Sequence, residues 1–114
     1  MDLSKQTHGD VVVITAADPR IDAAVAIEFK DRMRDLTADA DGRVILDLEQ
    51  VNFIDSSGLG AIVAAMKQLG GGKRLELAAL SPLVDKVFRL TRMDSVFVIH
   101  DTTATGLGDA SAAE

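Results

Sequence analysis

Apolar residues in this chain form short continuous runs and longer runs with helical spacing, and the two kinds alternate. Four short runs rich in Val, Ile and Leu predict strands, at residues 11–15, 44–48, 75–78 and 96–99. Residues 1–10 are polar and predict at most a short edge strand. Strands that alternate with helices at this spacing predict an α/β fold with a largely parallel sheet.

Polar residues mark the expected helix starts. Asp22 is the predicted N-cap of a helix over about residues 23–37, and Ser81 caps a later helix that begins with Pro82. The middle helix begins near Ser56 and ends at a triple glycine. Because helices that follow parallel strands start on one edge of the sheet, we expect Asp22, Ser56 and Ser81 to be neighbours there.

The most informative stretch is Asp55-Ser56-Ser57-Gly58-Leu59-Gly60, which joins a strand-like apolar run to a helix-like one. Asp and Ser are favoured at a helix start because their oxygens accept backbone N–H groups that have no partner within the helix. This capping role is one explanation of the two serines. The other is phosphorylation, since a helix N-terminus tolerates an anion and a phosphate would add about −1.5 to −2 charges.

This hexapeptide is preceded by Val44-Ile45-Leu46-Asp47-Leu48 and followed by Leu80-Ser81-Pro82-Leu83-Val84. In that register it resembles the STAS (sulfate transporter and anti-sigma antagonist) domain family, of the small anti-sigma factor antagonist type. The similarity covers roughly residues 8–101. It implies an α/β, STAS-type fold, with a mixed, mostly parallel β-sheet of four to five strands packed against helices. It also implies one domain over residues 1–101 and a tail over residues 102–114 with a short or frayed helix.

The resemblance implies a regulatory protein that is not an enzyme and needs no cofactor. In this family the serine after the aspartate, here Ser56, is phosphorylated by a GHKL-type serine kinase that is also an anti-sigma factor. The unphosphorylated protein binds that kinase and releases the sigma factor, and a PPM-type phosphatase resets the serine. Ser57 is then the expected cap. The residues expected to contact the partner are Asp22, Asp55, Ser57, Gly58 and Leu59.

Composition restricts the class of protein further. The 114 residues are 47% hydrophobic, with four Phe and no Trp or Tyr, which predicts a single domain with an aliphatic core. A net charge of −6 argues against a nucleic-acid partner, and the lack of Cys removes disulfides and thiolate sites. The N-terminus lacks the apolar run of a signal peptide, and the longest apolar stretch, 58–66, is too short to span a bilayer. We therefore expect a cytoplasmic monomer without membrane contact.

Enzymatic interpretations fit the residues poorly. The serine pair lacks the flanking glycines of a hydrolase elbow, and the only histidines, His8 and His100, are expected to face solvent. Gly58 and Gly60 lack the third glycine of a dinucleotide fingerprint and are expected to let their helix pack closely. Asp47 interrupts an apolar strand, and we expect it to have a structural hydrogen-bonding role. No metal-ligand spacing of His, Asp and Glu is present.

A second functional interpretation keeps the fold and changes the role. The chain would then be a STAS subunit of a lipid-transport ATPase or another scaffold, without serine phosphorylation and with the serine pair only capping. Residues 17–20, just before Asp22, also differ from the Gly-Glu-Leu pattern usual in the family, which leaves the identity of the partner open.

Overall fold

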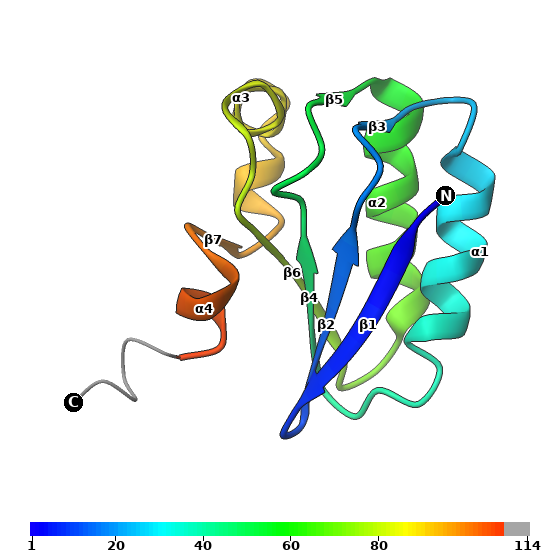
Figure 1. Ribbon diagram of the computed structural model, residues 1–114, viewed down its shortest axis with the longest axis vertical. Coiled ribbons are helices and arrows are strands. Elements are labelled where there is room, and N and C mark those ends of the chain that lie inside the picture. The colour runs from blue at the N-terminus through cyan, green and yellow to red at the C-terminus, as the bar shows by residue number, and fades with distance from the viewer. Residues whose placement is uncertain (109–114) are drawn as a thin grey trace.

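The computed structural model describes residues 1–108, in which a five-stranded sheet carries α1 and α2 on one face (Figure 1). The strands are β1 (Leu3–His8), β2 (Val11–Ala16), β3 (Arg20–Ile21), β4 (Arg43–Asp47), β5 (Phe53–Ile54), β6 (Arg74–Ala78) and β7 (Ile99–His100). The helices are α1 (Ala26–Leu36), α2 (Ser56–Leu69), α3 (Pro82–Leu90) and α4 (Thr103–Gly106), with a short 3-10 turn, η1 (Met93–Ser95).

The main sheet has the order β1-β2-β4-β6-β7, and β1 is its one antiparallel member. The two short strands β3 and β5 form a separate parallel pair above it (Figure 1). The predicted α/β fold with a mixed, mostly parallel sheet is therefore confirmed. Among residues 1–108, no helix combines the length and the apolar character that crossing a membrane requires. The part of the expected tail beyond residue 108 lies outside the described residues.

The two ends of the sheet differ from the sequence prediction. Residues 1–10, expected to hold at most a short strand, form the six-residue β1, which pairs with β2 through a turn at Gly9 with a φ of 65°. The strand expected over residues 96–99 is instead the two-residue β7. The N–H of Phe97 donates to the carbonyl of Met93, and its ring packs edge-on against Phe88 with centroids 6.0 Å apart. This turn occupies the residues that were expected to begin the strand.

The helix starts follow the prediction at two positions and depart from it at one. The helix expected after Asp55 begins at Ser56, and α3 begins at Pro82 with Ser81 as N-cap. However, the Ser81 hydroxyl does not cap α3; it donates to the carbonyl of Val51 over 2.8 Å. Asp22 is not the N-cap of α1, because that helix begins only at Ala26. The Asp22 carboxylate instead accepts the N–H of Ala24 in the preceding turn.

The central strands bury both of their faces. Alternate side chains point to opposite sides of a sheet, so each strand contributes to two separate clusters. The cluster beneath α1, α2 and α3 includes Val12, Ile14, Val44, Leu46, Leu75, Leu77, Ile62 and Phe88. The cluster on the opposite face consists of Val11, Val13, Ile45 and Ala78, with Leu107 against it. The second face explains why these strands are continuous apolar runs instead of alternating ones.

A buried carboxylate, Glu76, occupies that second face. Its side chain is 1% exposed and accepts hydrogen bonds from Arg43, at 2.6 and 3.0 Å, and from Arg74, at 2.7 Å. His100 Nε2 lies 2.7 Å from the same carboxylate, so His100 does not face solvent as predicted. Arg43 also donates to the carbonyl of Gly106 at 2.6 Å. Glu76 thereby connects β4, β6, β7 and α4 through one ionic cluster.

The environment of Glu76 favours its ionised form. Burial alone raises the pKa of a carboxyl group, but the hydrogen bonds from Arg43, His100 and Arg74 outweigh this and lower the pKa of Glu76 to about 2 from 4.5. A carboxyl group whose pKa is depressed in the folded state stabilises the fold above its unfolded pKa. The contribution is lost as the pH falls from about 4.5 towards about 2.

We predict that Glu76→Gln lowers the free energy of unfolding at neutral pH by on the order of 3 kcal/mol, because two arginines lose their buried counter-charge. The difference in the free energy of unfolding between wild type and variant should shrink as the pH falls below about 4.5. In that range Glu76 becomes protonated in the unfolded wild type but stays ionised in the folded protein. Urea denaturation over a range of pH measures this. The exposed Glu49→Gln variant is the control and should match wild type. A Glu76→Gln deficit that does not change with pH would contradict the ionised cluster.

Candidate functional site

The short β3–β5 pair brings two distant loops together at one end of the molecule. Arg20 is opposite Phe53 and Ile21 is opposite Ile54, with the strands running parallel. The residues that follow each strand therefore emerge side by side. On one side this is Asp22, and on the other it is Asp55, directly before α2.

The Asp55 carboxylate joins these two loops. Its Oδ1 accepts the N–H of Gly58 at 2.8 Å, which makes Asp55 the N-cap of α2, and its Oδ2 accepts the N–H of Ala23 at 3.1 Å. The Gly58 N–H, followed by those of Ala23 and Ser57, holds the pKa of Asp55 below its ordinary value, although burial acts in the opposite direction. Asp55 is therefore an ionised residue that caps α2 and also holds the loop after β3 against the start of this helix; we call this second role the Asp55 clamp.

The structure corrects the assignment of the cap. Ser57 was expected to cap α2, but it is the second helical residue, and the cap is made by Asp55. An N-cap side chain reaches the N–H three residues ahead, here that of Gly58, from a position where the backbone is still extended. The hydroxyls of Ser56 and Ser57 are not needed for this purpose, and both residues are exposed.

The two serines face different surroundings. Ser57 borders a shallow groove between α1 and α2 that also contains Ile27 and Lys30. Ser56 is not among the residues that line this groove. Ser56 is thus an exposed hydroxyl on the first turn of α2, at the positive end of the helix dipole.

Gly58 allows the start of α2 to lie directly against β3. A Cβ atom placed there would be 1.9 Å from the carbonyl oxygen of Ile21 and 3.1 Å from a side-chain carbon of Ile54. The expectation of close packing is therefore confirmed for Gly58. It is wrong for Gly60, which is exposed and has open space where a Cβ would be.

Arg20 and Asp22 form the outer part of the same site. The guanidinium of Arg20 lies over the ring of Phe53, 4.3 Å from its centroid, and its Nε donates to the carboxylate of Asp22 at 3.1 Å. The other oxygen of Asp22 accepts the N–H of Ala24. Asp22 is thus held against the β3–β5 pair, next to the loop that Asp55 binds.

Five expected partner-contact residues converge at this end of the molecule, but with different accessibility. Asp22, Asp55 and Leu59 are partly buried, Ser57 is exposed, and Gly58 is buried. Leu59 packs its inner side against the main core. Gly58 and Asp55 therefore mainly set the position of the backbone at the start of α2. The side chains of Asp22, Ser57 and Leu59 are accessible to a partner at least in part.

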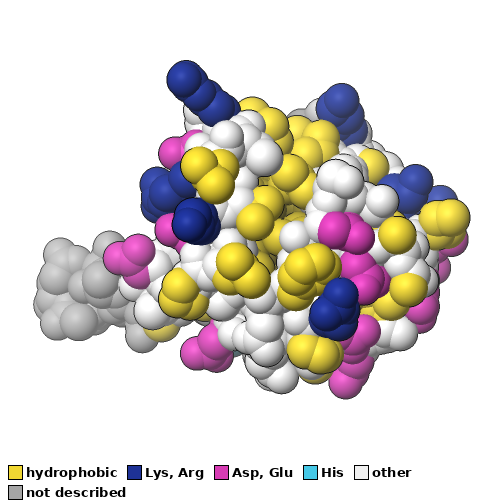
Figure 2. Space-filling model, turned by 90° about the horizontal axis from the view of Figure 1, so that it is seen from above, with side chains coloured by type: hydrophobic (Ala, Val, Ile, Leu, Met, Phe, Trp, Pro, Cys, Tyr) yellow, Lys and Arg dark blue, Asp and Glu magenta, His cyan; other side chains and the backbone are white. Residues whose placement is uncertain are grey.

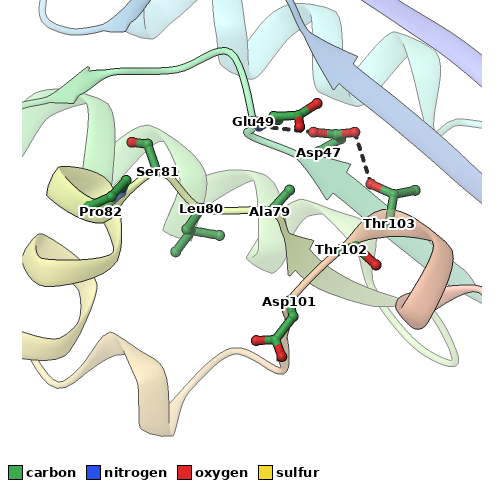
Figure 3. A pocket seen from close by; sticks show the side chains of 9 residues that line it. All are labelled: Asp47, Glu49, Ala79, Leu80, Ser81, Pro82, Asp101, Thr102 and Thr103. Carbon is green, nitrogen blue, oxygen red and sulfur yellow. Dashed lines mark hydrogen bonds between the residues drawn. The ribbon is translucent and has the colours of Figure 1, made fainter.

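Ser81, the third of the expected helix starts, has its hydroxyl bound to the carbonyl of Val51. It lines a separate hollow of about 450 Å³ on the other side of β5, with Pro82, Asp101 and Thr102 (Figure 3). Asp47 also lines it and has the structural role that was predicted: it accepts hydrogen bonds from the Glu49 N–H and the Thr103 hydroxyl, both at 2.9 Å. No cluster of three or more His, Asp or Glu side chains suited to a metal ion occurs within residues 1–108.

Comparison with known proteins connects this geometry to a family. The model of the STAS domain family matches residues 2–106. The chain belongs to the STAS domain family. Among its relatives is the anti-sigma-B factor antagonist of Staphylococcus aureus, which is 24% identical over 84 residues, covering 73% of this chain and 78% of the relative.

Solved structures of STAS proteins share the fold. An anti-sigma factor antagonist from Mycobacterium paratuberculosis superposes with a TM-score of 0.84 at 24% identity, over 95% of this chain and 92% of the other. The phosphorylated form of SpoIIAA, a cell fate determinant of Bacillus, superposes with a TM-score of 0.67 at 20% identity, over 96% and 99% of the two chains. At these identities the likeness establishes the architecture.

One residue of this STAS site was not expected from the sequence. Arg20 follows a Pro in an irregular segment, and nothing in its neighbourhood indicates that it stacks on Phe53 or pairs with Asp22. An Arg two residues before an Asp is the one available signal, and it is weak. The contact depends on the pairing of β3 with β5, which are 32 residues apart or more in the chain.

We predict opposite effects of alanine at the two glycines of the STAS motif. Gly58→Ala should lower the free energy of unfolding by about 1–3 kcal/mol, because its Cβ meets the rigid backbone of Ile21. Gly60→Ala should raise it by about 0.5–1 kcal/mol, since Ala restricts the unfolded chain and the space is open. Urea denaturation of both variants tests this. Equal effects of the two substitutions would show that the contact with β3 is not tight.

Proposed function

We propose that this STAS protein is an anti-sigma factor antagonist controlled by phosphorylation of Ser56. The observation that carries the proposal is the division of roles at the start of α2: Asp55 makes the cap, and the Ser56 hydroxyl is left exposed on the first turn. A kinase can reach such a hydroxyl without unfolding the helix. The relationship to anti-sigma factor antagonists supports the direction of the proposal.

The partner in this proposal is an anti-sigma factor that is also a GHKL-type serine kinase. The unphosphorylated protein binds it and releases the sigma factor, and a PPM-type phosphatase restores the free hydroxyl. We assign the contact to Asp22, Asp55, Ser57, Gly58 and Leu59, which surround Ser56. The protein would act as a cytoplasmic monomer and a regulator, not as an enzyme, with residues 1–101 as the working domain.

Electrostatic repulsion explains why phosphorylation of Ser56 would weaken the binding of the partner. A phosphate adds about −1.5 to −2 charges next to the carboxylates of Asp55 and Asp22. The N–H groups and dipole of α2 offset part of the local repulsion, so the fold persists. A partner surface that fits the neutral hydroxyl loses complementarity, and a penalty of about 3 kcal/mol weakens the complex roughly a hundredfold.

We predict that the purified protein takes up one phosphate from ATP in the presence of its cognate kinase, and that Ser56→Ala abolishes the uptake. Ser57→Ala, which removes the adjacent exposed hydroxyl, should still be phosphorylated. Intact-mass spectrometry and phosphopeptide mapping measure both results.

Two other outcomes would each reject this assignment. Uptake that persists in Ser56→Ala and disappears in Ser57→Ala would place the switch on Ser57. If a lipid-transport ATPase binds the protein and no kinase phosphorylates it, the chain is a STAS subunit of a transport complex, and the serines are only exposed polar residues.

We predict further that Ser56→Asp reduces affinity for the kinase by at least about tenfold through added charge. Its circular dichroism spectrum should match that of wild type, because an acidic residue is compatible with the first turn of a helix. Isothermal titration calorimetry measures the affinity, with Ser56→Ala as the neutral control. Tight binding by Ser56→Asp would argue against charge as the cause of release.

A further inference from the structure

The two sides of α2 have different neighbours. One side packs against α1, where Ser57, Gly60 and Ala64 border the α1–α2 groove. The other side carries Leu59, Val63 and Met66, at the spacing i, i+4 and i+7. These three side chains touch the main core but stay partly exposed. α2 therefore has an apolar flank that α1 does not cover.

A similar flank occurs on α3. Val84 and Phe88 point into the core, whereas Leu83 is 52% exposed and Leu90 is 73% exposed. Val87 lies between them on the helix surface and is partly buried. Two more valines that follow this helix, Val96 and Val98, are each 48% exposed.

The apolar flank of α3 faces back towards α2. The opposite flank, with Asp85 and Arg89, lines a hollow next to Ile99 and Asp101. Because that hollow lies beside β7, the edge strand of the sheet, the Leu83–Leu90 flank is turned away from the edge and towards the side on which β5 and α2 lie. We call the surface between the two flanks the α2–α3 groove. It is formed by Leu59, Val63, Met66, Leu83, Val87 and Leu90.

Figure 2 shows this end of the molecule from above. Hydrophobic side chains gather across the middle of the face. Lys and Arg side chains, with some Asp and Glu among them, stand along its left margin, the side on which α3 lies in Figure 1, and further charged side chains of both signs lie on the right. A continuous apolar surface with a polar margin is typical of an interaction site.

The α3 side of the groove carries basic side chains that are free of ion pairs. Lys86 is three residues after Leu83 and four before Leu90, so it lies between them on the surface of α3. Within residues 1–108, neither Lys86 nor Arg92 forms an ion pair, whereas Arg89 on the other flank is paired with acidic residues. Free cations beside an apolar surface favour a partner that is acidic as well as apolar.

We propose that the α2–α3 groove binds an acidic amphipathic helix of a partner protein. Each flank presents apolar residues over eight positions, about 10 Å from the first to the last, which matches two turns of a helix. A helix also satisfies its own backbone hydrogen bonds, which an apolar groove cannot do. A second copy of this chain fits less well, since a two-fold dimer would bring together two copies of a face whose free charges on α3 are basic.

This inference extends the proposed function without depending on it. The groove begins at Leu59, one turn after Ser56, so a partner that meets the serine can also insert a helix here. The groove itself is present whether or not Ser56 carries a phosphate. Failure of the phosphorylation experiments would therefore leave this proposal standing, and the reverse also holds.

The test uses the isotope-labelled full-length protein and two synthetic peptides of about 18 residues, long enough to form helix. Both peptides are Ala-based and carry Leu at i, i+3, i+4 and i+7, with a few Glu residues flanking the Leu stripe in one and Lys at the same positions in the other. We expect the acidic peptide to shift the methyl signals of Leu83, Val87 and Leu90 in a saturable manner, and to bind at least about tenfold more tightly than the basic peptide.

Matched variants locate the binding site. Leu90→Asp and Lys86→Glu should each weaken the acidic peptide about tenfold, because one removes apolar contact and the other reverses the charge. Ile27→Asp, at an exposed apolar residue of α1, and Lys73→Glu, in the turn before β6, should bind as wild type does. Circular dichroism checks that each variant is folded, as the exposure of Leu90 and Lys86 leads us to expect.

Several results would overturn the proposal. They are no saturable shift of the groove signals, equal affinity for the two peptides, and equal losses in the control variants. Shifts of the same methyl signals with protein concentration alone, abolished by Leu90→Asp, would assign the groove to a second copy of the chain.

Discussion

The carboxylate of Asp55 holds together two loops that come from distant parts of the chain. One of its oxygens closes the first turn of α2, and the other binds the loop after β3 through the N–H of Ala23. The pairing of β3 with β5 and the glycine contact at Gly58 both require this loop position. Because the N–H donors hold the pKa of Asp55 below its ordinary value, this carboxylate stays ionised to a lower pH than an unbonded carboxyl group does. The geometry around the candidate site depends on this interaction.

An acidic cap has a functional consequence for the hydroxyls that follow it. If Ser56 or Ser57 made the cap, modification of that hydroxyl would disrupt the helix start. With Asp55 as cap, a charge added at Ser56 alters the surface and leaves the backbone hydrogen bonds intact. A rigid platform of this kind suits a switch that acts on a partner contact. The α2–α3 groove, beginning one turn further at Leu59, then supplies apolar contact area that the small motif lacks.

The opposite face of the sheet serves stability and not the candidate site. Glu76 is buried there, forms ion pairs with Arg43 and Arg74 and is hydrogen-bonded to His100, and these contacts hold β7 and α4 onto the sheet. Such a cluster is costly to break, because removing one partner leaves a buried charge uncompensated. It does not contact the start of α2, so substitutions at the two places are expected to act independently. The ionic cluster and the candidate site therefore lie apart in the structure.

By itself, the sequence determined the central strands and the start of α2, since β-branched runs and a polar cap before an apolar helix are local signals. Only the tertiary structure decided features that depend on distant partners. The polar β1 carries no apolar signal and forms because β2 offers its free edge. Asp22, Asp55 and Glu76 acquired their roles from backbone and side-chain groups that are close in space and mostly far apart in the chain. The periodicity of hydrophobic residues indicates which positions are buried, but it does not indicate which polar groups form hydrogen bonds with one another after folding.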